Sequence, residues 1–194
     1  LRDADTGAEW ERDTISLVYS CTKGATALCA HMLVDQGKLD YNARVVDLWP
    51  EFAAGGKTDT TVAMMLGHTS PVPHLREPIK TGGLTDWEYM AERVALEPAF
   101  WEPGTRQGYH GLTYAWTVGN LVRLAAGMPL GALFAEQVAG PLELDFHIGL
   151  PDSEERRVAP MIPPTTSEVN FASKFFRMAT QQPGSLPNLF LNNQ

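Results

Sequence analysis

A serine and a lysine three positions apart stand at the start of an apolar segment with helical period. Ser20 and Lys23 lie in LVYSCTKGATALCAHMLVDQGK, residues 17–38. On a helix, side chains at this spacing share one face within a single turn. A serine hydroxyl becomes a strong nucleophile when a base removes its proton, and a lysine serves as that base if burial or nearby positive charge lowers its pKa. The pattern therefore fits acyl transfer, but it also fits a plain helix cap.

The elements that would position these two residues are mainly helical. Apolar residues with a helical period follow Cys21, and Gly37 supplies a stop. Further helices or helical turns are expected at 42–52, at 61–67 capped by Thr60, at 87–96 capped by Thr85 or Asp86, at 112–126 ended by Gly127, and at 130–138. A turn and strand are expected at 6–14, further short strands at 15–20 and 145–151, and long loops from Asp152 onward.

Composition excludes several classes of function. The formal net charge of −8 over 194 residues argues against a nucleic-acid partner, which would need clustered Lys and Arg. No apolar run approaches the roughly 18 residues of a membrane helix, and the start of the chain lacks the pattern of a signal peptide. The five histidines show no metal-ligand spacing, so neither a metal nor another cofactor is expected.

The two cysteines indicate a reducing compartment. Cys21 and Cys29 lie on the same predicted helix, eight positions apart. That spacing separates them by roughly 12 Å, which is too far for a disulfide. Free thiols are typical of proteins from the cytoplasm, and we expect that location. Because the chain begins at Leu1, we also expect it to be a portion of a longer chain.

Three later segments follow the Ser20 segment in a characteristic order. They are LGHTSPV at 66–72, EPGTRQGYHGLTYAWTVGNLV at 102–122 and GPLELDFHIGLP at 140–151. With the Ser20 segment they resemble the serine β-lactamase-related family, which shares its fold with penicillin-binding proteins. The resemblance extends over about residues 11–160 and is strongest to the β-lactamase-like esterases, the family VIII carboxylesterases.

The resemblance implies an α+β fold in which a helical region packs on an antiparallel sheet. We expect one domain over 1–194, mainly helical and lacking much of the sheet. It would comprise a nucleophile-helix region at 1–59, a mostly helical region with a tyrosine loop at 60–150, and a loop-rich return at 151–194. Such a portion, expressed alone, is expected to be unstable and to hydrolyse no ester, because its helices would leave apolar surface uncovered.

The resemblance also implies roles for individual residues. Ser20 would be the nucleophile, Lys23 its base partner and Tyr109 an aid to proton transfer. From its place next to Tyr109, His110 is expected either to line the substrate pocket together with Gly111 or to face solvent in the loop. Gly111 stands where related β-lactamases and penicillin-binding proteins carry an asparagine that binds the substrate amide, and this departure favours an esterase. The KTGG sequence at 80–83 is interpreted as a loop, because the similar family motif comes well after the tyrosine.

Three functions follow, in order of preference. The first is a serine hydrolase of the EC 3.1.1 type, which cleaves a small carboxylic ester through an acyl-enzyme on Ser20. The second is a β-lactamase or D-amino-acid peptidase, and the third is a non-catalytic scaffold with the same fold. No oligomeric state is predicted.

Overall fold

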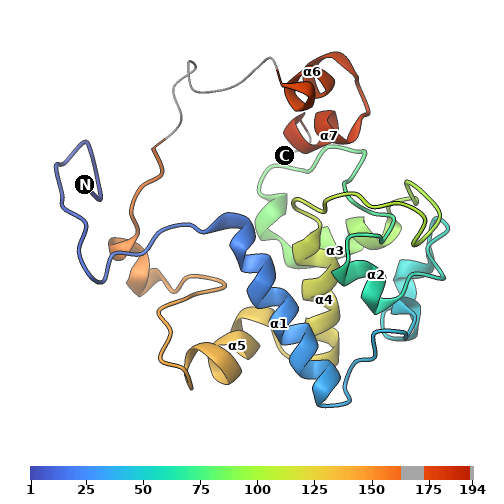
Figure 1. Cartoon of the computed structure of the whole chain (residues 1–194), viewed down its shortest axis with the longest axis horizontal. Coiled ribbons are helices and arrows are strands. Elements are labelled where there is room, and N and C mark those ends of the chain that lie inside the picture. Colours follow the sequence, from blue (N-terminus) through green and yellow to red (C-terminus); the bar gives the residue numbers. More distant parts are fainter. Residues whose placement is uncertain (163–172, 193–194) are drawn as a thin grey trace.

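The computed structural model describes residues 1–162 and 173–192, and the ordered elements of this part are helical (Figure 1). Seven α-helices are present there: α1 Thr22–Asp35, α2 Val62–Leu66, α3 Trp87–Leu96, α4 Tyr114–Ala126, α5 Leu130–Phe134, α6 Lys174–Gln181 and α7 Leu186–Asn192. Short 3₁₀ turns occupy Tyr19–Cys21, Val45–Asp47, Pro50–Ala53, Gly83–Thr85 and Asp152–Arg157, and a π-helical turn at Ala135–Ala139 extends α5.

The strands predicted within 6–14 and at 15–20 and 145–151 are wrong for the described residues. Within 1–162 and 173–192 the only β-pairing consists of two isolated bridges, Ile15 with Val158 and Arg44 with Thr61. A strand needs a hydrogen-bonded neighbour along its length, and Val158 provides one at a single position only. The sheet of the expected α+β class is therefore not seen here. The prediction of loops after Asp152 is also corrected, by the turn at Asp152–Arg157 and by α6 and α7, while 163–172 lie outside the described residues.

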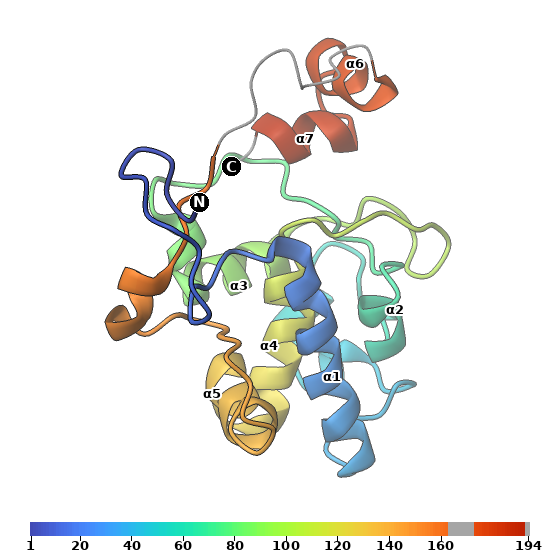
Figure 2. The same cartoon turned by 60° about the vertical axis from the view of Figure 1, so that its left-hand side comes forward.

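The long helices α1 and α4 pack along each other, and α5 packs against both (Figure 2). Each contributes an apolar face to one core, as helical period requires. The buried apolar residues of α1 and α4 include Cys29, Ala30, Leu33, Val118, Leu121 and Val122. Gly37 and Gly127 end these helices in the left-handed conformation, with φ of 69° at both, as their positions in the sequence predict.

Two predicted helix caps have different outcomes. Asp86 caps α3 as expected, because its carboxylate accepts the N–H of Tyr89 at 3.1 Å. The Thr60 cap is wrong: the hydroxyl of Thr61 caps α2 by accepting the N–H of Met64 at 3.3 Å. Thr60 itself is fully buried, and its hydroxyl has no hydrogen-bond partner among the described residues.

No single helix in the described ranges is long and apolar enough to cross a membrane. Helix α4 taken together with 130–139 passes by length and composition, but the two segments are bent by 69° relative to each other and belong to the core. The helices α6 and α7 pack on each other as a pair near the end of the chain (Figure 1).

A fully buried lysine joins two loops beside the core. The Nζ of Lys57 donates hydrogen bonds to the carbonyl oxygens of Ala54 and Glu97, the latter at 2.5 Å, and lies 5.0 Å from the centre of the Phe52 ring. Burial lowers the pKa of Lys57 to about 8, and the negative charge of Glu97 opposes this shift. Both hydrogen bonds satisfy carbonyls that the loops would otherwise bury unpaired.

Candidate active site

Ser20 lies in the 3₁₀ turn Tyr19–Cys21, which runs directly into α1. Its hydroxyl does not cap either element, since neither has a side-chain cap hydrogen bond. Instead the Nζ of Lys23, one turn further along, donates to Ser20 Oγ at 3.1 Å. The helix-cap interpretation of Ser20 is therefore wrong, and the serine and lysine side chains share the face that their spacing predicts.

The residue before Ser20 has a strained backbone. Tyr19 has φ of 44°, a left-handed conformation that costs a non-glycine residue roughly 1–2 kcal/mol. Its side chain is 66% exposed, so burial of the ring does not offset this cost. The strained turn presents the Ser20 hydroxyl at the N-terminus of α1, next to the positive end of the helix dipole.

The ammonium group of Lys23 connects three parts of the chain. Besides Ser20 it donates to the carbonyl oxygen of Gly111 at 2.8 Å. It also lies 4.9 Å from the ring centre of Tyr109 and 5.8 Å from that of Tyr114, within the range of cation–π attraction. These contacts join the start of α1 to the loop that precedes α4.

Tyr109 is the third of the predicted catalytic residues that this arrangement brings together. Its interaction with the Ser20 side chain, and then with Lys23 and the positive charge there, lowers the pKa of the Tyr109 phenol. The Tyr109 side chain is 54% exposed and therefore accessible from solvent. The Ser20 hydroxyl, the Lys23 ammonium and the Tyr109 ring are therefore gathered in one place.

A cavity of about 510 Å³ opens next to Ser20, between the start of α1 and the start of α4. It is lined by Tyr19, Ser20, Thr22, Lys23, Thr26, Tyr109, Gly111, Leu112, Tyr114, Ala115 and Trp116. Most of this wall is apolar. Gly111 contributes only backbone, so no side chain there can bind a substrate amide.

His110 does not occupy the place expected for a substrate contact. Its imidazole is fully buried and lines no part of the Ser20 cavity. Nε2 lies 3.3 Å from the hydroxyl of Ser70, and Nδ1 lies 2.7 Å from the carbonyl oxygen of Gly108. Burial lowers the pKa of His110 to about 4. The side chain turns inward because these buried partners satisfy both ring nitrogens.

Sequence reasoning missed His68, which packs beneath the tyrosine. Its ring centre lies 5.2 Å from that of Tyr109, 5.2 Å from that of His110 and 4.9 Å from that of Tyr114. The segment 66–72 had contributed to the family resemblance, but no role followed from its sequence. The signal available was a histidine directly after a helix-ending glycine, Gly67.

Two other motifs lie away from the cavity. Lys80, the first residue of KTGG, forms an ion pair with Asp86 at 2.8 Å and lies 4.2 Å from the Tyr89 ring centre. The loop interpretation of 80–83 is confirmed, since this segment contains a turn and the start of a 3₁₀ helix. His31 is exposed, and its Nδ1 lies 2.9 Å from the Tyr41 hydroxyl.

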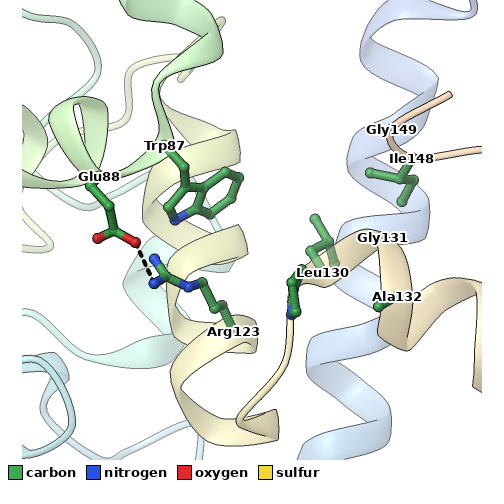
Figure 3. A pocket seen from close by; sticks show the side chains of 9 residues that line it. Trp87, Glu88, Arg123, Leu130, Gly131, Ala132, Ile148 and Gly149 are labelled. Carbon is green, nitrogen blue, oxygen red and sulfur yellow. Dashed lines mark hydrogen bonds and ion pairs between the residues drawn. The ribbon is translucent and has the colours of Figure 1, made fainter. Parts of the chain in front are cut away.

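A larger cavity, about 700 Å³, lies between α3, α4 and the start of α5 (Figure 3). Trp87 and Leu130 face each other across it, and the ion pair of Glu88 with Arg123 lies at its edge. Among its lining residues no hydroxyl or thiol stands beside a base. Size alone therefore does not identify a reactive site, and only the smaller cavity of the two places a hydroxyl beside a lysine.

The comparisons with known proteins agree with this geometry. The sequence model of the family described as Beta-lactamase matches residues 1–180. The protein named Esterase/beta-lactamase LipL of Mycobacterium tuberculosis is 37% identical over 166 residues, which cover 83% of this chain and 38% of that protein.

Solved structures give the same result. A family VIII carboxylesterase has a TM-score of 0.81 and 44% identity, covering 84% of this chain and 45% of that one. A penicillin-binding protein homolog from Caulobacter crescentus has a TM-score of 0.81 and 35% identity, covering 84% and 44%. The chain thus spans less than half the length of these relatives.

Proposed function

Since the chain belongs to the β-lactamase family of serine hydrolases, we propose that it carries the nucleophile region of an enzyme that cleaves small carboxylic esters. The observation that carries the proposal is the position of the Lys23 ammonium, 3.1 Å from Ser20 Oγ and over the ring of Tyr109. In this arrangement the phenolate of Tyr109, stabilised by the Lys23 charge, would accept the proton of the Ser20 nucleophile, as acyl transfer requires.

In the proposed reaction Ser20 Oγ attacks the ester carbonyl carbon as its proton passes to the Lys23–Tyr109 pair. The tetrahedral intermediate collapses, the C–O bond to the alcohol breaks, and the pair returns the proton to the leaving oxygen. A water molecule then attacks the acyl-enzyme and releases the acid. The lowered pKa of Tyr109 makes its phenolate easier to form, and the charge of Lys23 stabilises that phenolate.

The β-lactamase activity stays as a second candidate because one relative is named both esterase and β-lactamase. Gly111 favours the ester, because glycine has no side-chain amide for a lactam substrate. Its backbone carbonyl already accepts a hydrogen bond from Lys23. A scaffold without activity is the third possibility, and the open cavity at Ser20 argues against it.

The test is covalent labelling of Ser20 by a fluorophosphonate, with peptide mapping, in the natural protein that contains this chain. A label on Ser20 that is lost in Ser20→Ala, together with faster turnover of a chromogenic ester than of a chromogenic β-lactam, is the expected result. A label that remains in Ser20→Ala would refute the assignment of the nucleophile. Turnover of the lactam alone would select the second candidate, and inertness to both the third.

A further inference from the structure

One residue, His68, holds the peptide on both sides of Tyr109. The carbonyl oxygen of His68 accepts the N–H of Gly108 at 3.1 Å, and its Nδ1 accepts the N–H of His110 at 3.1 Å. The His68 ring also packs on the Tyr109 ring, with 5.2 Å between centres. His68 therefore contacts the backbone before Tyr109, the backbone after it and the Tyr109 ring.

The hydrogen bonds define where the protons of the two histidines lie. A carbonyl oxygen only accepts, so Nδ1 of His110 carries the proton that it donates to Gly108, and its Nε2 accepts from the Ser70 hydroxyl. Nδ1 of His68 receives a backbone N–H, so it has no proton and the neutral ring carries its proton on Nε2. The neighbouring histidines thus hold opposite tautomers.

A protonated His68 would not keep this arrangement. An N–H at Nδ1 would face the N–H of His110 and the Nδ1 of the same residue, which is only 3.3 Å away and already protonated. The ionisable groups around the His68 ring are Lys23, Tyr109, Tyr114 and His110. Burial, and then the positive charge of Lys23, lower the pKa of His68 and favour the neutral ring.

We propose that His68 is a positioning residue: its neutral imidazole, protonated on Nε2, fixes the Tyr109 loop so that the phenol stays beside Ser20 and Lys23. The effect on catalysis rests on the proposed function, whereas the assignment of the two tautomers does not rest on it. His68 does not line the Ser20 cavity, so it acts through Tyr109. Displacement of a catalytic group by about 1 Å can slow turnover by about 100-fold.

The backbone of His68 limits which substitutions are informative. Its φ is 60°, a left-handed conformation in which His, Asn and Asp are enriched among non-glycine residues. Asparagine tolerates this φ and can place its side-chain oxygen where Nδ1 accepts the N–H of His110. Alanine loses the acceptor and the ring together. His31→Ala removes an exposed histidine outside the site and serves as the matched control.

The kinetic test uses His68→Ala, His68→Asn and His31→Ala in the natural protein, with kcat and KM for a chromogenic ester and the thermal midpoint of each variant. We expect His68→Ala to lower kcat by about 10- to 100-fold with KM changed by less than about 3-fold, and His68→Asn to recover most of kcat. An unchanged kcat in His68→Ala, or a His68→Asn as slow as His68→Ala at equal thermal midpoint, would overturn the proposal.

The second measurement needs neither activity nor a variant. Imidazole ¹⁵N chemical shifts at pH 7 to 8 should show His68 protonated on Nε2 and His110 protonated on Nδ1, with nuclear Overhauser contacts between the Tyr109 ring and Lys23. The reverse tautomer at His68 would refute the positioning role. If the wild type shows the expected tautomers and contacts but neither labels at Ser20 nor hydrolyses an ester, then the proposed function fails while the placement of Tyr109 by His68 stands.

Discussion

Removal of the Tyr109 hydroxyl separates proton transfer from the other roles of this side chain. In Tyr109→Phe the ring remains, so its packing on His68 at 5.2 Å and the ammonium of Lys23 at 4.9 Å from its centre are both retained. The side chain is 54% exposed, so the free energy of unfolding should change by no more than about 0.5 kcal/mol. Any large kinetic effect is then attributable to the lost O–H group.

The expected kinetic effect follows from the contribution of general acid–base catalysis. Loss of a positioned proton carrier lowers turnover by about 10²- to 10⁴-fold, which corresponds to about 3–5 kcal/mol in the activation barrier. KM should change by only a few-fold, because phenylalanine preserves the cavity wall. Steady-state hydrolysis of a chromogenic ester by the natural protein gives both constants, and chemical denaturation gives the stability.

Tyr41→Phe is the matched control. It removes the same atom from an exposed tyrosine whose hydroxyl lies 2.9 Å from His31, outside the cavity. If Tyr109→Phe keeps the wild-type kcat, or if Tyr41→Phe loses as much, then Tyr109 does not carry the proton as we infer.

Three further predictions concern Lys23, the buried Lys57 and two glycines. Lys23→Met keeps most of the apolar stem but loses the ammonium, and kcat for the ester should fall by at least about 10²-fold while KM changes little. Between about pH 8 and 10.5 Lys57 is protonated in the unfolded chain but not in the folded chain. The free energy of unfolding of the wild type should therefore rise across this window, by up to about 3 kcal/mol. Denaturation curves at pH 7.5 and 10 should show this rise for the wild type and not for Lys57→Met. Gly108→Ala brings a Cβ within 2.5 Å of the Trp101 ring and should destabilise by about 1–3 kcal/mol, whereas Gly24→Ala, with open space on α1, should stabilise by up to about 1 kcal/mol in the same assay.

Local signals in the sequence predict helices α1 to α5, whereas α6 and α7 were expected to be loop. Gly37 and Gly127 end α1 and α4 where a left-handed residue is needed, and Asp86 caps α3 through a hydrogen bond within its own turn. The pairing of Ser20 with Lys23 follows from helical spacing alone. Each of these depends on residues within four positions of one another, which is the range that local pattern describes.

Features that depend on distant contacts were not predictable in this way. The expected strand at 15–20 has the composition of a strand, but pairing depends on a partner distant in sequence, and Val158 supplies a single bridge. His110 stands next to Tyr109 in sequence yet faces the opposite way, because Ser70 and Gly108 satisfy its ring. The role of His68 depends on a left-handed backbone and on a loop 40 positions later, and neither has a local signature.

Chemical labelling of the buried Lys57 can measure how often the loops around it open. A primary amine that donates to the carbonyls of Ala54 and Glu97 with no exposed surface cannot react with an acylating reagent in the folded state, whereas the exposed Lys38 can. Acylation of Lys57 therefore requires the loops at 54–57 and 97 to separate first, and its rate measures how often they do so. In timed labelling with mass spectrometry, the delay between Lys38 and Lys57 gives the free energy of that local opening, without any denaturant.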